Sequence, residues 1–302
     1  MKNLKYILVS FILVLNFSCS DSKVVADSYG KLTIKLTDAP MPYNQFMEAN
    51  ITIDKIELGN AADANSFIVI MNQTTTYNML DLVNGITETL TSMDIPEGKY
   101  DTLRLYISSA EMVMNNGASF TYNMGQIGSI GNGSMMGGSM MFNNQEGSID
   151  ITLDHFMDIM ANSQNDFLMD LDIDHSFSLQ GVGFSGMGAN MMMTMTGFTF
   201  NPTMRFVDMH EAGSISGTVH SDQGDLANVT ITMMQGAQIY TTTHTDANGH
   251  YHFIGIPNDT YTMHAEADGY TMNSTGNNSN MGNIQMMNNT DLSIDFNMIK
   301  SN

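Results

Sequence analysis

Hydrophobic and polar residues alternate along several short stretches in the first half of the chain. The stretches cover residues 31–36, 49–58, 66–70 and 100–107 and are rich in β-branched and aromatic residues. An alternation with a period of two is typical of strands that bury one face, so these stretches predict strands. Two further segments, residues 81–90 and 154–161, are expected to hold short helical turns. The first part of the chain is therefore predicted to be mainly β.

From Gly213 to the C-terminus the predicted strands follow one another at shorter spacing. Each short apolar run in this part is followed by Gly, Asn, Asp or Pro. The roughly 90 residues involved match the size of one immunoglobulin-like sandwich. We place the domain boundary near residues 211–213 and predict two β-sandwich domains, over residues 30–210 and 213–302. Each needs its own apolar core, because the chain has no pair of cysteines that could form a disulfide.

The N-terminus has the pattern of a bacterial lipoprotein signal peptide. Lys2 and Lys5 precede the apolar run 6–15, and Cys19, the single cysteine of the chain, follows it. The run is too short to span a bilayer, which takes ~20 apolar residues. We expect residues 1–18 to be removed, Cys19 to carry the lipid, and residues 19–29 to form a polar tether. The alternative is a cleaved secretory signal with an ordinary Cys19, which would lack a disulfide partner.

A lipid on Cys19 predicts a protein of the cell envelope. Asp21 follows the lipidated residue closely. In bacterial lipoproteins of the acidic, Asn-rich style that this chain resembles, acidic residues at this place favour export to the outer face of the outer membrane. We therefore expect a protein that is lipid-anchored to the outer membrane and either periplasmic or exposed at the surface.

The chain is strongly acidic. Its formal net charge is −21, and loss of Lys2 and Lys5 with the signal peptide makes it −23. Between Tyr106 and Ile299 the only Lys or Arg is Arg205. Nucleic acid is excluded as a partner, because its phosphates need a basic surface. The charge favours cations or neutral ligands such as glycans, and nothing in the pattern points to a protein partner.

Six blocks occur in order along the first domain. They are Leu36-Thr-Asp-Ala-Pro40, Ile53-Asp-Lys-Ile-Glu-Leu58, Leu80-Asp-Leu-Val-Asn-Gly85, Ile95-Pro-Glu-Gly-Lys-Tyr-Asp-Thr-Leu-Arg-Leu105, Leu168-Met-Asp-Leu-Asp-Ile-Asp174 and Asn201-Pro-Thr-Met-Arg-Phe-Val207. On these blocks, residues 30–210 resemble the bacterial lipoprotein family known as domain of unknown function 4382. The resemblance implies no particular activity, because none is assigned to that family.

A second set of motifs covers the C-terminal domain. It comprises Gly213-Ser-Ile-Ser-Gly-Thr-Val219, Ala227-Asn-Val-Thr-Ile231, Thr245-Asp-Ala-Asn-Gly-His-Tyr-His-Phe253, Ile256-Pro257, Tyr261 and Gly269-Tyr270. Gly249 can supply the positive φ of a tight turn, and Tyr251 and Phe253 are expected to point inward. This part resembles a carboxypeptidase regulatory-like domain, a prealbumin-like β-sandwich often grouped with starch-binding-like folds. The resemblance implies an accessory role, in stability or in carbohydrate contact, without catalysis.

Methionine is unusually common, with 31 residues, whereas tryptophan is absent. Thioethers are soft ligands that suit Cu(I), and Gly and Asn spacers would let a chain wrap around the ion. The candidate copper ligands are Met135, Met136, Met140, Met141, Met191, Met192, Met193 and Met195. The alternative is that these residues fill irregular gaps in the core and in loops.

Three histidines form a second candidate metal site. If Tyr251 and Phe253 point inward, His250 and His252 point outward from the same strand. His244 lies across the tight turn from His250, so a hairpin would let two or three imidazoles converge on a divalent ion. The alternative is that these histidines are ordinary polar positions on the outside of strands.

Three aspartates form a candidate calcium site. Asp170, Asp172 and Asp174 alternate along one predicted strand, so their carboxylates would share a face and could bind Ca²⁺. The alternative is the polar side of a half-buried strand, because no ligand loop with a turn glycine accompanies them.

Catalytic motifs are lacking in the sequence. The segment Gly183-Phe-Ser-Gly-Met187 departs from a nucleophile elbow at Met187, and no zinc-protease motif, P-loop or dinucleotide fingerprint occurs. A pair of carboxylates for a hydrolase stays open as the least favoured alternative.

We therefore expect a membrane-anchored, extracytoplasmic lipoprotein that acts as a non-catalytic binding or structural module and needs no cofactor. A glycan is the favoured ligand on the analogy with starch-binding-like folds. Because tryptophan is absent, the sugar would stack on tyrosines such as Tyr240, Tyr251, Tyr261 or Tyr270. The alternative function is Cu(I) binding by the methionine-rich segments.

Overall fold

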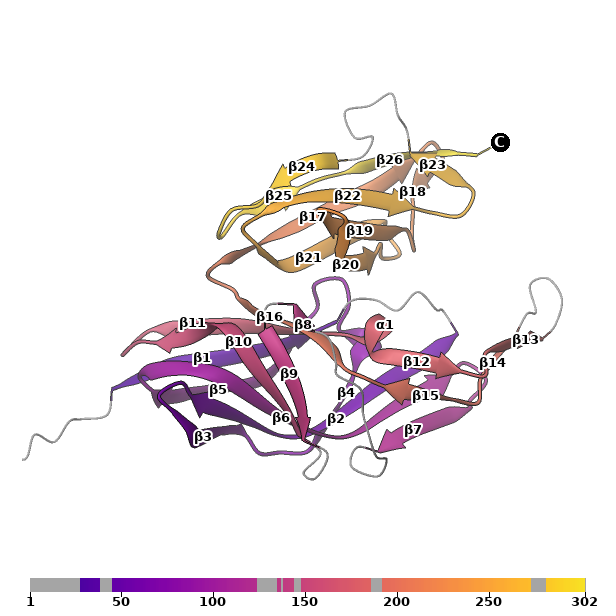
Figure 1. Ribbon diagram of the computed structural model, residues 1–302. Helices are drawn as coiled ribbons and strands as arrows, with labels where there is room; N and C mark the ends of the chain where they lie inside the picture. Colours follow the sequence, from indigo (N-terminus) through magenta and orange to yellow (C-terminus); the bar gives the residue numbers. More distant parts are fainter. Residues whose placement is uncertain are drawn as a thin grey trace, which may run out of the picture.

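The computed structural model describes residues 28–38, 45–123, 135–136, 138–143, 148–185, 192–272 and 281–301. The predicted signal peptide (residues 1–18), Cys19 and Met191 lie outside the described residues. The chain forms two β-sandwiches that stack on each other (Figure 1). The predicted fold class, mainly β with two sandwich domains, is confirmed.

Two sheets build the first sandwich. One contains, in order, β5 (Glu88–Pro96), β1 (Tyr29–Thr37), β11 (Gln164–Asp172), β16 (Thr203–Asp208) and β8 (Met135–Met136). The other contains β3 (Asp63–Met71), β2 (Phe46–Asn60), β6 (Gly98–Met114), β10 (Ser148–Ile159) and β9 (Gly138–Asn143), with β4 (Thr75–Asn78) beside β2 and β7 (Ser119–Asn123) beside β6.

The predicted alternation produces the core of this sandwich. Leu32 and Ile34 on β1 face Ile56 on β2 and Leu103 on β6, and all four side chains are fully buried in one apolar cluster. The polar residues between them point to the outer faces of the sheets. The four predicted strands are therefore correct.

The helical turn predicted at 154–161 is wrong, because residues 154–159 belong to β10. Their pairing with β6 resumes after a register shift between Thr152 and Met157. The shift turns Met157 and Ile159 inward, where each is only 1% exposed, and leaves Phe156 outside. The other predicted helical segment, residues 81–90, shares only Asp81 with a short 3-10 helix, η1 (Met79–Asp81), and its end belongs to β5, which begins at Glu88.

Two short ribbons extend one end of the first sandwich. They pair β12 (Phe177–Gln180) with β15 (Gly197–Phe200), and β13 (Gly183–Ser185) with β14 (Met192–Thr194). The single turn α1 (Ile173–Ser176) connects β11 to β12. None of the helices in the described part of the chain is long and apolar enough to cross a lipid bilayer.

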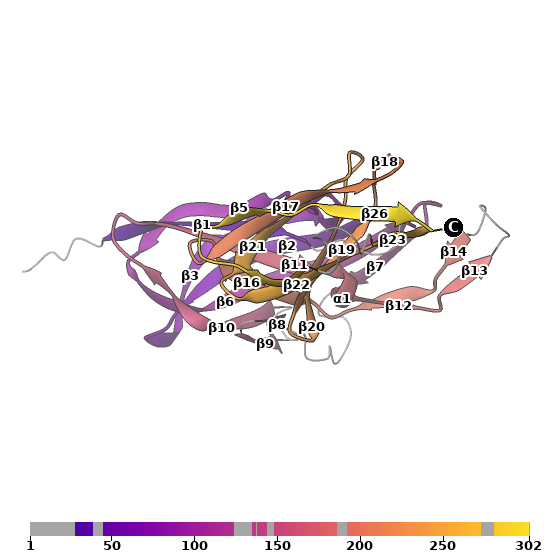
Figure 2. The same cartoon turned by 90° about the horizontal axis from the view of Figure 1, so that it is seen from above.

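The second sandwich also has two layers. One contains β18 (Gly224–Asp225), β17 (Ala212–Ser221), β26 (Phe296–Lys300) and β23 (Tyr270–Met272), with β21 (His250–Pro257) and β25 (Asp291–Ser293) beside β17. The other contains β20 (Gln238–His244), β19 (Thr230–Gln235), β22 (Thr260–Glu266) and β24 (Met281–Gln285). Seen from above, this sandwich covers the part of the first that contains β1, β11 and β16 (Figure 2).

Candidate functional site

The methionines of the predicted copper site fall into two groups. The backbone places Met135 and Met136 on β8 and Met140 and Met141 on β9, and these two strands lie against each other. In contrast, Met193 and Met195 are 3% and 8% exposed and belong to the apolar core of the first sandwich. Packing in the core therefore explains Met193 and Met195, whereas the other four methionines lie on two strands whose backbones are close to each other. Met192 is the first residue of β14.

The predicted histidine hairpin is wrong. β20, which ends at His244, pairs with β19, whereas β21, which begins at His250, pairs with β17. The tight turn between them therefore connects two different sheets. His244 contacts Thr230 (Nε2 to Oγ1, 3.2 Å) and His250 contacts Thr218 (Nδ1 to Oγ1, 2.8 Å). Burial lowers the pKa of His244 and of His252.

The three aspartates of the predicted calcium site do not share a strand face. β11 ends at Asp172, and Asp174 lies in α1. Asp172 caps this turn by accepting a hydrogen bond from the His175 backbone at 3.0 Å, and its second oxygen lies 2.7 Å from His175 Nδ1. Among the described residues no three His, Cys, Asp or Glu side chains gather closely enough to hold a metal ion.

The tyrosines predicted as a sugar platform are mostly buried. Tyr240, Tyr251 and Tyr261 are 9%, 1% and 1% exposed, because they fill the interior of the second sandwich. Tyr251 and Phe253 point inward as predicted, and the Tyr251 hydroxyl donates to the Ile294 carbonyl at 2.6 Å. Only Tyr270 of the four predicted tyrosines is half-buried. A platform of several stacked tyrosines is therefore wrong.

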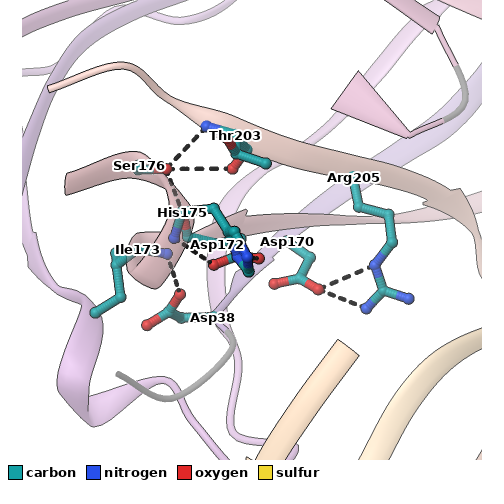
Figure 3. A network of polar contacts seen from close by, with 8 residues as sticks. All are labelled: Asp38, Asp170, Asp172, Ile173, His175, Ser176, Thr203 and Arg205. Carbon is teal, nitrogen blue, oxygen red and sulfur yellow. Dashed lines mark hydrogen bonds and ion pairs between the residues drawn. The ribbon is translucent and has the colours of Figure 1, made fainter. Parts of the chain in front are cut away.

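The most elaborate polar arrangement of the described residues lies where the two sandwiches meet. Arg205 on β16 pairs with Asp170 on β11: Nε and Nη2 donate to Asp170 Oδ2 at 3.0 and 2.5 Å (Figure 3). The two side chains are 9% and 6% exposed. They are opposite each other in the register of β11 and β16, so the sheet itself sets their approach.

Arg205 also reaches into the second sandwich. Its Nη1 donates to the Gly255 carbonyl at 3.2 Å, and its guanidinium lies 4.5 Å from the centre of the Tyr240 ring. Burial by itself lowers the pKa of Arg205, but Tyr240 and Asp170 raise it above its ordinary value. Burial raises the pKa of Tyr240, so its hydroxyl stays neutral beside the guanidinium. The guanidinium therefore stays charged and holds three groups from both domains.

A loop of the first sandwich covers the edge of β21. Asn84, at φ 58°, accepts a hydrogen bond from the His252 backbone at 2.6 Å and donates to the His250 carbonyl at 3.4 Å. A Cβ on the adjacent Gly85 would lie 2.5 Å from the His252 ring, so this approach needs glycine. Because β21 pairs with β17 on its other side, Asn84 acts there as a substitute for a neighbouring strand.

This loop is in turn held by the end of β1. The Thr37 hydroxyl donates to the carbonyls of Leu82 and Ile86 at 3.0 and 2.9 Å. Asp38 accepts a hydrogen bond from the Ile173 backbone at 3.0 Å, beside α1 (Figure 3). Four of the six sequence blocks of the first domain, around residues 36–40, 80–85, 168–174 and 201–207, therefore meet at the junction.

A second group of contacts in Figure 3 fixes α1 against β16. Ser176 Oγ donates to the Asp172 carbonyl and accepts from the Thr203 backbone, the latter at 2.8 Å. Burial raises the pKa of Asp172. Asp172, His175 and Ser176 in and beside this turn thus each have a structural partner.

Apolar contacts complete the junction. Leu168, Val207 and Ala212 are buried together, with Met209 and Ile254 packed against them. A cavity of about 20 Å³ between the domains is lined by Asp38, Asp170, Arg205, Thr243 and His252, among other residues. This volume suits one water molecule, whereas pockets for small-molecule ligands measure ~300 Å³ or more. The junction is therefore built to hold two domains together.

The sequence pointed to this site through one signal only. Arg205 is the single Lys or Arg between Tyr106 and Ile299, which marks a cation with a specific partner. Neither the ion pair with Asp170 nor the edge contact of Asn84 could be recognised from spacing, because their partners lie 35 and 168 residues away.

The fold and the site define a class of two-domain protein, in which specific polar and apolar contacts join two β-sandwiches. The family model described as "Domain of unknown function (DUF4382)" matches residues 29–185, and the chain belongs to this family. The model "Carboxypeptidase regulatory-like domain" matches residues 214–298, so such a domain follows. No curated protein matches the chain.

Several solved structures match the chain with low similarity. The Bacillus anthracis TIE protein is 9% identical, with a TM-score of 0.26, and the similarity covers 93% of this chain and 59% of that one. GBS52, the minor pilin of Streptococcus agalactiae, is 9% identical, with a TM-score of 0.24 and coverage of 89% and 96%. The shaft pilin SpaA of Lactobacillus rhamnosus GG is 10% identical, with a TM-score of 0.24 and coverage of 91% and 99%.

Proposed function

We propose that this protein is a lipid-anchored, non-catalytic structural and binding module of the outer envelope. The observation that carries the proposal is the junction, where the sequence blocks of the first domain hold the second sandwich in one orientation. A buried ion pair that bonds to both domains, together with a capped strand edge, favours a rigid two-domain body. The acidic surface agrees with an exposed location outside the cytoplasm.

Three features support a role without catalysis. The Arg205 guanidinium and the Asn84 amide of the junction are occupied with structural bonds, and the cavity beside them suits a single water molecule. The second domain matches a regulatory-like, accessory class of module. Neutral glycans are the ligand class that the charge favours, but they would have to bind without Tyr240, Tyr251 and Tyr261, which are buried.

The anchor is tested by changing the lipidated residue. We expect Cys19→Ser to move the protein from the membrane fraction to the soluble fraction, because it removes the only site for the diacylglyceryl group. The measurement is detergent phase partitioning, together with incorporation of labelled palmitate. Ser18→Ala is the matched control and should stay in the detergent phase. Partitioning of the Cys19→Ser protein with the detergent would contradict the anchor.

A second candidate function is Cu(I) binding, and one observation favours it. β8 and β9 lie against each other, so four methionines occupy neighbouring strands, and Met135 is opposite Met204 in the register of β8 and β16. Thioethers are ligands that suit a soft monovalent ion.

Replacing Met135, Met136, Met140 and Met141 by leucine together should abolish stoichiometric Cu(I) uptake. Leucine keeps the volume and removes the sulfur, so the fold should be retained. The measurement is competition for Cu(I) against a chromophoric chelator, with circular dichroism as the check on folding. The pair Met193→Leu and Met195→Leu is the matched control, because these side chains are in the core. Equal affinity in the fourfold variant and the control would reject these ligands.

A further inference from the structure

One end of the first sandwich presents a group of exposed apolar side chains. Tyr29, Phe156 and Met160 are 46%, 56% and 64% exposed. They come from the start of β1, from β10 and from the turn between β10 and β11. Figure 1 shows β1 beginning at the same end at which β10 passes into β11. We call these three residues, together with Lys99, the anchor-side tip.

Backbone contacts hold the segments of the anchor-side tip together. The Asn162 backbone donates to the Tyr29 carbonyl at 2.8 Å, and the Glu97 backbone donates to the Ser28 carbonyl at 2.7 Å. The Lys99 ammonium lies 5.5 Å from the centre of the Phe156 ring. The tip is therefore a defined surface that three strands present together.

Chain length brings this surface close to the proposed lipid. Cys19 precedes Ser28 by nine positions, which span at most ~32 Å when fully extended. Because β1 begins beside the tip, a lipid on Cys19 would hold this end of the molecule within ~32 Å of the bilayer. Aromatic rings, methionine and a lysine with a long apolar stem are side chains that suit the headgroup region.

We propose that the anchor-side tip docks into the headgroup region of the bilayer that carries the anchor, so that the two sandwiches stand on the membrane in one orientation. The inference rests on the proposed lipid anchor. The local charge indicates which lipid is favoured. Glu97 and Asp158 are exposed beside the tip and would repel anionic headgroups, so zwitterionic headgroups are favoured.

The absence of tryptophan provides a sharp test. Phe156→Trp places a single fluorescent reporter at the tip of the lipidated, full-length protein, and Val182→Trp places one at the far end of the sandwich, beside β13 (Figure 1). Val182 is 44% exposed, which makes it a matched control. Both proteins are reconstituted in phosphatidylcholine vesicles, and flotation is measured together with tryptophan emission.

Docking predicts that the Phe156→Trp emission shifts to shorter wavelength in vesicles and is quenched by brominated lipid, whereas the Val182→Trp emission is unchanged. Flotation without a shift at position 156 would overturn the docking and leave the anchor intact. Failure of the lipidated protein to float would overturn the anchor, and the docking with it. A further outcome is a Phe156→Trp emission that shifts equally without vesicles, by an amount that grows with protein concentration. That result would assign the tip to contact with a second copy of the chain and would overturn the docking.

Discussion

Replacing Arg205 by methionine should destabilise the protein by about 3–5 kcal/mol, because it leaves the Asp170 carboxylate buried without its partner. The change also removes the bond to the Gly255 carbonyl and the contact with the Tyr240 ring. The free energy of unfolding is measured by urea denaturation, and hydrogen exchange read by mass spectrometry locates the loss. We expect faster exchange in β11, β16 and β21, on both sides of the junction.

The chain contains a matched control for this variant. Arg104 also donates two hydrogen bonds to an aspartate on the neighbouring strand, from Nε to Asp150 Oδ1 at 2.5 Å and from Nη2 to Asp150 Oδ2 at 2.8 Å, and its guanidinium lies 4.1 Å from the Phe67 ring. This pair is more exposed than that of Arg205, because the Arg104 and Asp150 side chains are 23% and 29% exposed. Arg104→Met should therefore cost only about 0–1 kcal/mol.

A double variant separates the ion pair from the rest of the junction. If the buried charge is the cause, adding Asp170→Asn to Arg205→Met should recover part of the lost stability, since an amide is cheaper to bury than a carboxylate. Similar costs for Arg205→Met and Arg104→Met would show that burial at the junction is unimportant. That result would remove the main support for a rigid two-domain body.

The second large effect is expected at Gly217, where alanine should destabilise the second sandwich by about 3 kcal/mol. An added Cβ would lie 1.7 Å from the Ile294 carbonyl oxygen. That carbonyl cannot move easily, because it accepts from the Tyr251 hydroxyl at 2.6 Å, and the Ile294 backbone donates to Ser216 at 2.8 Å. The change should therefore separate β17 from the segment around residue 294.

Ser216→Ala is the control for Gly217→Ala, because Ser216 is adjacent on the same strand and exposed. Its replacement should change the free energy of unfolding by less than about 0.5 kcal/mol. In hydrogen exchange, the Gly217→Ala effect should be confined to the second sandwich. An unchanged urea midpoint for Gly217→Ala would mean that the backbone around Ile294 relaxes without cost.

Local patterns predicted the strands and turns well where one face of a strand is exposed. The alternation along residues 49–58 and 100–107 became β2 and β6, and Gly249 takes the positive φ, 77°, of the predicted turn. The pattern failed at residues 154–161, because a register shift in β10 sets which residues turn inward. Such a shift depends on the partner strand and leaves no local signal.

Interactions between sheets decided the outcome of the candidate sites. The turn before His250 is as predicted, yet its two flanking strands join different sheets, which separates His244 from His250. The alternation correctly turned Tyr251 inward, but it could not show that Tyr240 and Tyr261 face the same interior. Side-chain orientation along a strand follows from the sequence, whereas the surface that a side chain meets does not.

β11 shows most directly what the local sequence pattern cannot predict. Its aspartates suggested the polar side of a half-buried strand, but five consecutive residues, Phe167–Leu171, are buried. One face of the strand packs in the core of the first sandwich, and the other lies under the second sandwich, where Arg205 neutralises Asp170. A polar residue on a strand can therefore mark a domain interface as well as a surface.

The sequence by itself determined the β class of both domains, the family of the first and the type of the second, because period-two alternation and turn residues act locally and the blocks are specific. Only the tertiary structure decided that the blocks around residues 36–40, 80–85, 168–174 and 201–207 form one junction. Their contacts join residues far apart in the chain, and the packing of one sandwich on the other determines which of their polar groups lose water and which keep it.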